Sequence, residues 1–532
     1  MEQDGQRPSA TTLKRVQFWL LVFVSAWFLW VSPDSWHYTQ DSGIYVGTAE
    51  SMVETGTYRF NGYPNLLYYP GLSSLLALPI YFFGVDFQIL HLLCTALGVL
   101  GLWLARELFS VERYGWPGLA VPLLMAGHSL LFYQVFAILS DGVFLTASLA
   151  ALLFWRIYEE KSPGWALAAC FVVTVFASLV RFQGLFLCAG FGAALLLRAL
   201  PGGRWEWKAI ARVSGLSLAV VSPFVLWTWR NFRQHSPDTF SMSNTQFFGL
   251  EGLELYAPGF MRDPTIDQEW LYGVYNLLGT FEGLGTIFFS RHVVGGAPDW
   301  LFPALILGAA AWGTRRWFQR AKGMERIYVL LSLAYLFGGA LSRDSLYTVP
   351  RYWLPLLPFL LVSASLGIQG IYERLAGTRF QAAFAAIALT LGMLAVVRGA
   401  QDSFPWESAP GFERRNAALM ELRAYVDEWV DADASIATSD WGVLPWALQR
   451  TSYQLLNDAD HRFSLARIDR FQTGYLAILA GTGAIGREAK NMVNAFPDVF
   501  SPLFFTSRQG RAPAGRLYHV DLEGVARVLA SD

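Results

Sequence analysis

The side chains that could do chemistry in this sequence are carboxylates and arginines beside hydrophobic segments. Asp41 follows the uncharged run Val16 to Ser32, and Tyr45 comes four residues later. Asp141 precedes a second apolar run. A carboxylate is costly to hold at a membrane, and paired carboxylates can divide proton transfer and charge stabilisation between them. Both aspartates are therefore candidate catalytic groups; the alternative is that each caps the helix that follows it.

Three arginines lie at the ends of apolar stretches. Arg181 interrupts the stretch 165–200, Arg230 ends another, and Arg351 with Tyr352 opens a third. A guanidinium matches phosphate oxygens in a bidentate geometry, so these residues are candidate anion ligands. The alternative is that each arginine is an interfacial anchor at a helix end. Together, the arginines and carboxylates suit transfer from a phosphate-bearing lipid, in which arginines hold the leaving group and a carboxylate activates an acceptor hydroxyl or amine.

The composition is that of a membrane protein. Of 532 residues, 54% are hydrophobic and 15% are charged, against about 25% charged in soluble domains. The net charge of −1 gives no argument for a nucleic-acid partner. The three cysteines lie inside apolar runs and predict no disulfide. We predict no metal or other cofactor.

Eleven segments are candidate membrane spans, because each has roughly 17 to 20 mainly apolar residues. They are 16–33, 87–108, 117–137, 140–157, 164–181, 183–200, 209–229, 299–314, 326–342, 352–371 and 380–397. The positive-inside rule places the tail 1–15 and basic residues such as Arg156 in the cytoplasm. The loops 34–86 and 230–298 are then external. The same opposite face also holds Asp41, Asp141, Arg181, Arg343, Asp344 and Arg351.

Two further apolar stretches are predicted to lie at the membrane surface. Residues 70–84 are too short to span and predict an interfacial helix within the first external loop. Residues 270–290 are interrupted by Glu282 and are placed at the surface of the loop 230–298. If one of these stretches spans, every later assignment changes side unless a second span is also missed.

The residues after about 400 change character. Apolar residues recur with helical spacing over 417–426, and 435–439, 475–480 and 517–520 have the composition of short buried strands. The expected fold is a polytopic α-helical membrane protein, with a transmembrane domain at 16–399. A small extracytoplasmic α/β domain is expected at 400–532.

The order of these landmarks resembles the GT-C superfamily of polyprenyl-phosphate-sugar glycosyltransferases. Within this superfamily, the sequence resembles bacterial enzymes similar to protein mannosyltransferases and the aminoarabinose transferase that acts on lipid A. The resemblance covers about residues 16–400 and rests on order and membrane side. Its landmarks are Asp41 with Tyr45, Tyr69-Pro70, Ser140-Asp141, Arg181 with Gly184, Trp229-Arg230-Asn231, and Arg351-Tyr352 with Pro355 and Pro358.

The resemblance implies a role for each of these residues. Asp41 would be the catalytic base or would position the acceptor, and Asp141 would support the same site. Arg181 and Arg351 would contact the lipid phosphate. Tyr45, Tyr69, Arg230 and Tyr352 would also bind substrate. Such enzymes typically invert the anomeric centre.

Two departures from the family pattern bear on metal and acceptor. Ser42 follows Asp41 where many relatives carry a second acid, which argues against a required divalent metal. The segment before Pro70 lacks the lysine of the aminoarabinose transferases, which argues against lipid A as the acceptor.

The resemblance also implies the partners and the location. The expected partners are a polyprenyl-phosphate-linked sugar donor, the lipid bilayer and an acceptor that the sequence does not identify. The expected location is the bacterial inner membrane, with the active site facing outward.

Two other functions compete with this interpretation. A transporter or flippase of lipid-linked or anionic substrates would also carry charges in the membrane, but the sequence shows no repeated halves. A non-catalytic assembly or sensor protein would retain its activity after Asp41→Asn.

Overall fold

The computed structural model describes residues 10–34, 36, 39–66, 68–199, 207–234, 301–341, 350–403, 409–440, 443–455, 461–479, 483–506 and 513–531. The chain forms two compact units. The helical unit holds the described residues of 1–32, 92–227 and 268–404. The α/β unit holds those of 33–91, 228–267 and 405–532. The predicted segment 270–290 and the residues Arg343 and Asp344 lie outside the described residues.

A helix lies at each of the eleven positions where a span is predicted. In chain order these helices are α1 (Ala10–Trp30), α4 (Phe87–Leu108), α6 (Trp116–Ala126) with α7 (Ser129–Phe136), α8 (Ser140–Lys161), α9 (Gly164–Val180), α10 (Gly184–Ala199), α11 (Trp207–Gln234), α14 (Leu301–Arg320), α15 (Gly323–Leu341), η4 (Pro350–Leu356) with α16 (Leu357–Arg374), and α17 (Phe380–Ser403). The short α5 (Val111–Tyr114) precedes α6.

Five of these helices are long and apolar enough to cross a membrane. They are α1, α4, α8, α11 and the continuous η4–α16 segment. The pair α6 and α7 makes a sixth if a span bent by 55° is accepted. The predicted count of eleven is therefore not confirmed, although the predicted helical class is.

The predicted span 117–137 is two helices, for a local reason. Gly127 ends α6, and His128 then takes an extended conformation. The Nδ1 atom of His128 accepts a hydrogen bond from the Leu130 amide at 3.2 Å, which satisfies an amide in the first turn of α7. A polar side chain that caps a new helix in this way redirects the chain.

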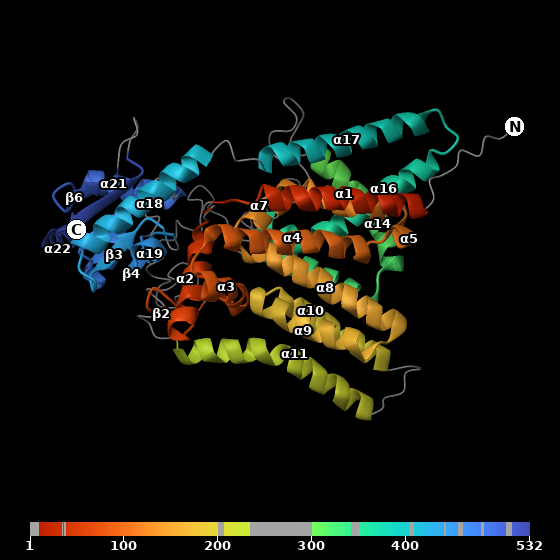
Figure 1. Ribbon diagram of the computed structural model, residues 1–532, viewed down its shortest axis with the longest axis horizontal. Helices are drawn as coiled ribbons and strands as arrows, with labels where there is room; N and C mark the ends of the chain where they lie inside the picture. Colours follow the sequence, from red (N-terminus) through yellow and green to blue (C-terminus); the bar gives the residue numbers. More distant parts are fainter. Residues whose placement is uncertain are drawn as a thin grey trace. The chain divides into compact units, whose positions relative to one another are not determined.

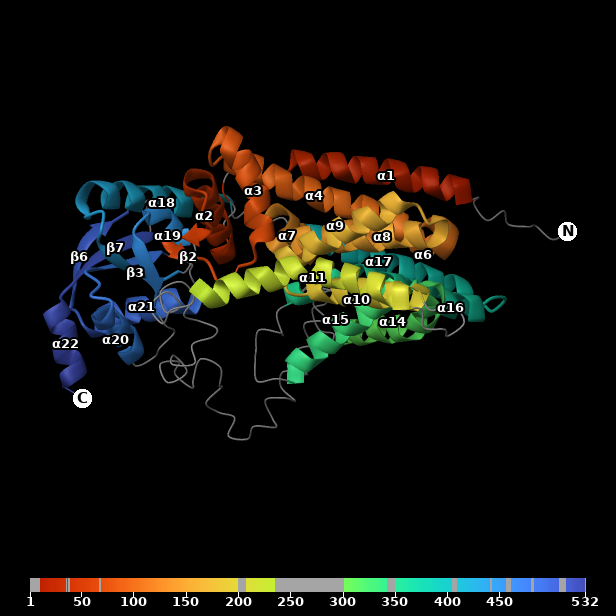
Figure 2. The same ribbon diagram turned by 90° about the horizontal axis from the view of Figure 1, so that it is seen from below.

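Close helix contacts define the packing of the helical unit. Helices α8, α9 and α10 run side by side (Figure 1). Helix α14 packs along α16 (Figure 2). A Cβ atom on Gly313 would overlap the Ser363 carbonyl oxygen, and one on Gly367 would overlap that of Ala309. Small residues therefore let these two backbones approach, as is common between membrane helices.

A buried ion pair joins α8 to α15. Arg156 is 5% exposed and Glu325 is fully buried. The Arg156 Nη2 atom lies 2.5 Å from Glu325 Oε1, and Nη1 donates to the Leu108 carbonyl oxygen. Arg156 is predicted in a cytoplasmic loop, but its side chain lies between helices. Removing either partner would leave an uncompensated buried charge.

The α/β unit contains a five-stranded mixed sheet. Its elements are α2 (Gln40–Thr55), β1 (Arg59–Phe60), β2 (Tyr63–Pro64), α3 (Pro70–Phe83), α18 (Ala409–Trp429), β3 (Ser435–Thr438), α19 (Val443–Leu448), β4 (Thr451–Gln454), α20 (Arg462–Arg470), β5 (Tyr475–Leu479), α21 (Gly483–Ala495), β6 (Phe500–Phe505), β7 (Gly515–Val520) and α22 (Leu522–Ala530). The strand order is β4-β3-β5-β7-β6. Strand β3 is parallel to β4 and β5, and β7 is antiparallel to β5 and β6.

Three of the five strands match the sequence prediction, and two do not appear in it. Strands β3, β5 and β7 correspond to the predicted strands, because their side chains fill the core with residues such as Ala437, Leu476 and Val520. Strands β4 and β6 are the edge strands. Strand β4 is a short Thr-Ser-Tyr-Gln segment, and β6 carries Pro502. An edge strand is allowed short length and proline, so neither shows the buried-strand pattern.

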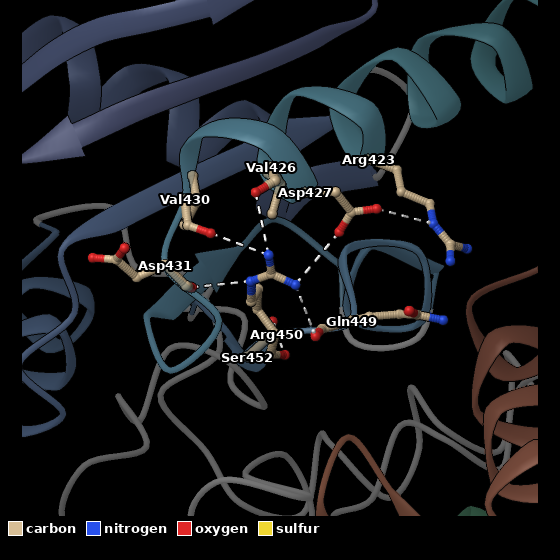
Figure 3. Close-up of polar contacts among 8 residues, drawn as sticks. All are labelled: Arg423, Val426, Asp427, Val430, Asp431, Gln449, Arg450 and Ser452. Atoms are coloured by element: carbon tan, nitrogen blue, oxygen red, sulfur yellow. Dashed lines mark hydrogen bonds and ion pairs between the residues drawn. The ribbon is translucent and has the colours of Figure 1, made fainter. Parts of the chain in front are cut away.

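The side chain of Arg450 caps the C-terminal end of helix α18 (Figure 3). The guanidinium of Arg450 donates to the carbonyl oxygens of Asp431 at 3.0 Å, Val430 at 3.1 Å and Val426 at 3.3 Å. Its Nη1 atom also lies 3.4 Å from Asp427 Oδ1. The last carbonyls of a helix have no partner within it and carry partial negative charge, so this cation both satisfies and stabilises the helix end.

The first loop packs on the C-terminal residues within the α/β unit. Trp446 Nε1 of α19 donates to Glu50 Oε2 of α2 at 2.6 Å, and its ring meets that of Trp36 at 4.6 Å. The side-chain Nδ2 atom of Asn61 donates to the Ser452 carbonyl oxygen at 3.1 Å. The loop 34–86, predicted as part of the transmembrane domain, therefore belongs to the same compact unit as the predicted C-terminal domain.

Candidate active site

Asp41 lies in the first turn of α2 but does not cap it. The N-cap is Thr39, whose side chain accepts from the Ser42 amide at 3.3 Å. Ser42 Oγ in turn accepts from the Thr39 amide at 2.9 Å. The capping alternative for Asp41 is therefore wrong, because this reciprocal pair already occupies the cap. Its carboxylate accepts a hydrogen bond from the Tyr68 hydroxyl at 2.9 Å, and the helix N-terminus favours its negative charge.

Tyr68 is held rigidly beside Asp41. The Tyr68 amide donates to Asn65 Oδ1 at 3.1 Å, and the Tyr58 hydroxyl donates to the Tyr68 carbonyl at 2.7 Å. Asn65 Nδ2 donates to Thr48 Oγ1 of α2 at 2.9 Å. The ring of Tyr45 meets the Tyr68 ring edge-on at 5.1 Å. We call Asp41, Tyr45 and Tyr68 the Asp41 cluster.

Sequence reasoning does not find Tyr68. It selects the neighbouring Tyr69, because that residue directly precedes the helix-starting Pro70. In the structure Tyr69 is the N-cap residue of α3 and makes no side-chain capping bond. Tyr68 stands 27 residues from Asp41 in the chain, and no local periodicity links the two.

Arg230 holds the loop that carries Tyr68. Its Nη2 atom donates to the Tyr58 carbonyl at 3.0 Å and its Nη1 to the Asn65 carbonyl at 3.3 Å. The neighbouring Asn231 donates from Nδ2 to the Leu66 carbonyl at 2.7 Å. Burial raises the pKa of the Tyr58 hydroxyl, so this tyrosine stays a neutral donor. Arg230 thus contacts backbone oxygens, and these contacts fix the loop.

A second group of predicted residues meets in the helical unit. Arg181 Nη1 lies 2.7 Å from Asp141 Oδ1 and donates to Ser140 Oγ at 3.2 Å. Arg181 Nε donates to Gln183 Oε1 at 2.9 Å. The guanidinium carbon lies 5.3 Å from the Tyr352 ring centroid.

Arg351 completes this group. Its guanidinium lies 5.4 Å from the same Tyr352 ring, which makes Tyr352 a common aromatic neighbour of both arginines. We call Asp141, Arg181, Arg351 and Tyr352 the acid–arginine cluster.

The position of Asp141 resembles that of Asp41. Both are the second residue of a helix, α8 and α2 respectively. The N-cap of α8 is Leu139, which makes no side-chain capping bond. The capping alternative for Asp141 is therefore wrong as well, because its carboxylate pairs with Arg181.

The alternative that Arg181 is an interfacial anchor does not fit its surroundings. Arg181 follows the last residue of α9, in an extended conformation, and its side chain is only 14% exposed. The Asp141 side chain that it contacts is 3% exposed. A guanidinium held by a buried carboxylate and an aromatic ring is pre-organised to meet a second anion. Among the residues that the structure describes, no three His, Cys, Asp or Glu side chains are grouped as metal ligands.

Solved structures share this fold over almost the whole chain. ArnT from Cupriavidus metallidurans in the apo state has a TM-score of 0.56 and 15% identity, over 96% of this chain and 99% of its own. ArnT of the same organism bound to undecaprenyl phosphate has a TM-score of 0.52 and 15% identity, over 94% and 97%. An Archaeoglobus fulgidus oligosaccharyltransferase, tethered with an acceptor peptide containing the NVT sequon, has a TM-score of 0.52 and 12% identity, over 96% and 74%.

One of these similar structures holds undecaprenyl phosphate, and another is an oligosaccharyltransferase with an acceptor peptide. The chain therefore has the fold of these proteins, and its long apolar helices are those of a multi-pass membrane protein. At such identities the fold is what the likeness shows. No protein-family model and no curated protein matches the chain.

Proposed function

We propose that this chain of GT-C fold is a membrane glycosyltransferase that moves a sugar from a polyprenyl-phosphate carrier to an acceptor. The observation that carries the proposal is the carboxylate of Asp41, held through one oxygen by Tyr68 at a helix N-terminus. The similar ArnT structure that binds undecaprenyl phosphate supports a lipid-phosphate donor. The acceptor class is a hydroxyl or amine of a lipid, glycan or protein on the extracytoplasmic face.

The reaction is one displacement at the anomeric carbon. The acceptor oxygen or nitrogen forms a bond to that carbon, while the bond from the carbon to the phosphate oxygen breaks. The acceptor proton passes to Asp41, and the electron pair of the broken bond leaves with the lipid phosphate. Attack from the face opposite the leaving group inverts the anomeric centre, and a base within hydrogen-bond reach of the acceptor assists it.

Each cluster has its own role in this proposal. In the Asp41 cluster, Tyr68 fixes the orientation of the carboxylate, which acts as the base or positions the acceptor. In the acid–arginine cluster, Arg181 and Arg351 bind the donor phosphate, because preorganised guanidinium groups stabilise charge that develops on a leaving phosphate. Asp141 supports the reaction by holding Arg181, and Tyr352 supports both arginines. Tyr45, Tyr69 and Arg230 form and brace the acceptor side.

The decisive experiment compares glycolipids and glycans of membranes that carry wild-type protein or Asp41→Asn. We expect the transferred sugar to be lost in the variant, because an amide cannot accept the acceptor proton. The matched control is Asp34→Asn, an exposed aspartate of the same loop, which should retain the wild-type profile. An unchanged profile for Asp41→Asn at normal protein level would refute the transferase proposal.

A further inference from the structure

Helix α3 carries apolar side chains on both of its faces. Residues 70–83 contain no charged residue. Leu72, Leu76 and Ile80 form a buried stripe on the helix, which packs along α2 within the α/β unit (Figure 2). A helix that is apolar all round is buried on all sides or lies in contact with lipid. The second face of α3 therefore needs an explanation.

That second face ends in a group of exposed aromatic rings. Leu78 is 61% exposed, and Tyr81, Phe82 and Phe83 are 69%, 72% and 66% exposed. The rings of Tyr81 and Phe82 meet edge-on at 5.1 Å. We call Leu78 and residues 81–83 the aromatic tip of α3. Exposed apolar groups of this size mark a binding surface.

The chain itself fixes where the aromatic tip can lie. Phe83 is joined to Phe87, the first residue of the candidate span α4, by only three residues. Four extended residue steps reach at most about 14 Å. The tip is therefore held close to the surface of the membrane that α4 enters. Lipid is the apolar partner that this connection places within reach.

The length of α3 decides how it meets that lipid. Its 14 residues correspond to about 21 Å of helix, which is shorter than the roughly 30 Å hydrocarbon core. The helix cannot span, but it can bury one apolar face at the boundary of headgroups and acyl chains. Tyrosine and phenylalanine suit this boundary.

We propose that the aromatic tip of α3 inserts into the outer leaflet and sets the height of Asp41 above the membrane. The mechanical link is short. Helix α3 begins at Pro70, two residues after Tyr68, and the Tyr68 hydroxyl contacts Asp41 at 2.9 Å. The insertion is independent of the reaction, whereas its consequence for catalysis rests on the proposed transferase function.

Insertion is tested by fluorescence quenching in vesicles. Phe82→Cys carries an environment-sensitive label, and the full-length protein is reconstituted in phosphatidylcholine vesicles with nitroxide groups on the acyl chains. The three native cysteines are buried, which limits background labelling. The control is Trp429→Cys, because Trp429 is a comparably exposed aromatic at 65% and lies on α18 of the same unit. Strong quenching at 82 with little at 429 is expected; equal quenching at both positions would overturn the proposal.

The catalytic consequence is tested with two triple variants. Replacing residues 81–83 by serine should lower kcat about tenfold, because small misplacements of a catalytic group are costly. Replacing them by leucine should restore kcat, since leucine keeps the apolar surface. Equal kcat values for the serine variant and wild type would refute the coupling to Asp41. The quenching result needs no turnover, so failure of the proposed function is distinguishable from failure of insertion.

Discussion

The Tyr68 hydroxyl donates a hydrogen bond to Asp41 Oδ1 over 2.9 Å. The ring of Tyr68 is packed against Tyr45, and its backbone is fixed by Asn65 and Tyr58. The carboxylate is thereby oriented by a residue that is itself held by three residues of the first loop and α2. A catalytic group gains most from such support when the supporting side chain cannot move.

Removing the Tyr68 hydroxyl should slow turnover. We expect Tyr68→Phe to lower kcat by about tenfold or more without a comparable change in the donor KM, because the orientation of Asp41, the proposed base, would matter most in the transition state. The measurement is steady-state transfer from a polyprenyl-phosphate-sugar. The control is Tyr425→Phe, which removes a hydroxyl from a ring stacked on Phe504 in the same unit and should retain wild-type kcat. A wild-type kcat for Tyr68→Phe would show that Asp41 needs no such support.

The Asp141–Arg181 pair should behave as one functional group. Breaking a largely buried pair by removing one partner costs about 3–5 kcal/mol. We expect Asp141→Asn, Arg181→Gln and the double variant to lose similar stability, with the effects far from additive. Thermal unfolding of the purified protein measures this cycle. The exposed pair Arg316–Glu373 is the comparison, and its cycle should show about 0–1 kcal/mol of coupling. Additive effects at Asp141 and Arg181 would contradict the pairing.

Gly313 should tolerate no side chain. The added Cβ of Gly313→Ala would overlap the Ser363 carbonyl, so we expect a loss of about 1–3 kcal/mol from overpacking. Gly308 lies on the same helix, and a Cβ there meets nothing within 4 Å. Gly308→Ala should therefore be neutral or slightly stabilising, since alanine favours helix over glycine. Equal thermal midpoints for the two variants would mean that α14 and α16 do not pack this closely.

Arg450 should stabilise the end of α18. Arg450→Ala removes donors to three carbonyl oxygens, and we expect a loss of about 1–2 kcal/mol. The control Arg423→Ala loses a partly exposed ion pair to Asp427, at 3.6 Å within the same helix. It should change stability by less than about 0.5 kcal/mol. Denaturant unfolding followed through a label on α18 would reveal the difference, and a smaller effect at 450 than at 423 would contradict the capping role.

Glu50 should make the stability of the α/β unit depend on pH. Burial is the main cause that raises the pKa of this carboxyl above its ordinary value of 4.5, although the Trp446 hydrogen bond opposes it. A raised folded pKa means that the stabilising contribution is full below the unfolded pKa and is lost as pH rises through the folded pKa. Glu50→Gln keeps an acceptor for Trp446 but cannot ionise.

The Glu50→Gln variant should therefore gain stability relative to wild type as pH rises from about 4.5 to neutral. Thermal midpoints of both proteins across this range measure the gain. The control is Glu428→Gln, which replaces an exposed carboxylate on α18 of the same unit. A wild-type advantage that grows with pH would reverse the sign and show that Glu50 is stabilised as the charged form.

The sequence by itself determined the helices, part of the sheet and most of the polar candidates. The uncharged run 16–32, for example, is helical as far as Trp30, because a helix satisfies the backbone hydrogen bonds of such a run locally. Strands β3, β5 and β7 were predictable because each contains a short run of mainly apolar residues. The sequence also pointed to four charged residues, Asp41, Asp141, Arg181 and Arg351. A charge beside a membrane span is costly to hold, so such residues are candidates for a functional role.

Only the tertiary structure decided which of these groups meet. Tyr68 reaches Asp41 across 27 residues, and Arg181 reaches Asp141 through the packing of α8 against α9. The edge strands β4 and β6, the Arg450 cap on α18 and the docking of Trp446 on Glu50 are likewise long-range. The physical reason is that composition and periodicity indicate how a segment satisfies its own backbone hydrogen bonds. A hydrogen bond between distant side chains depends on the packing that brings their segments together.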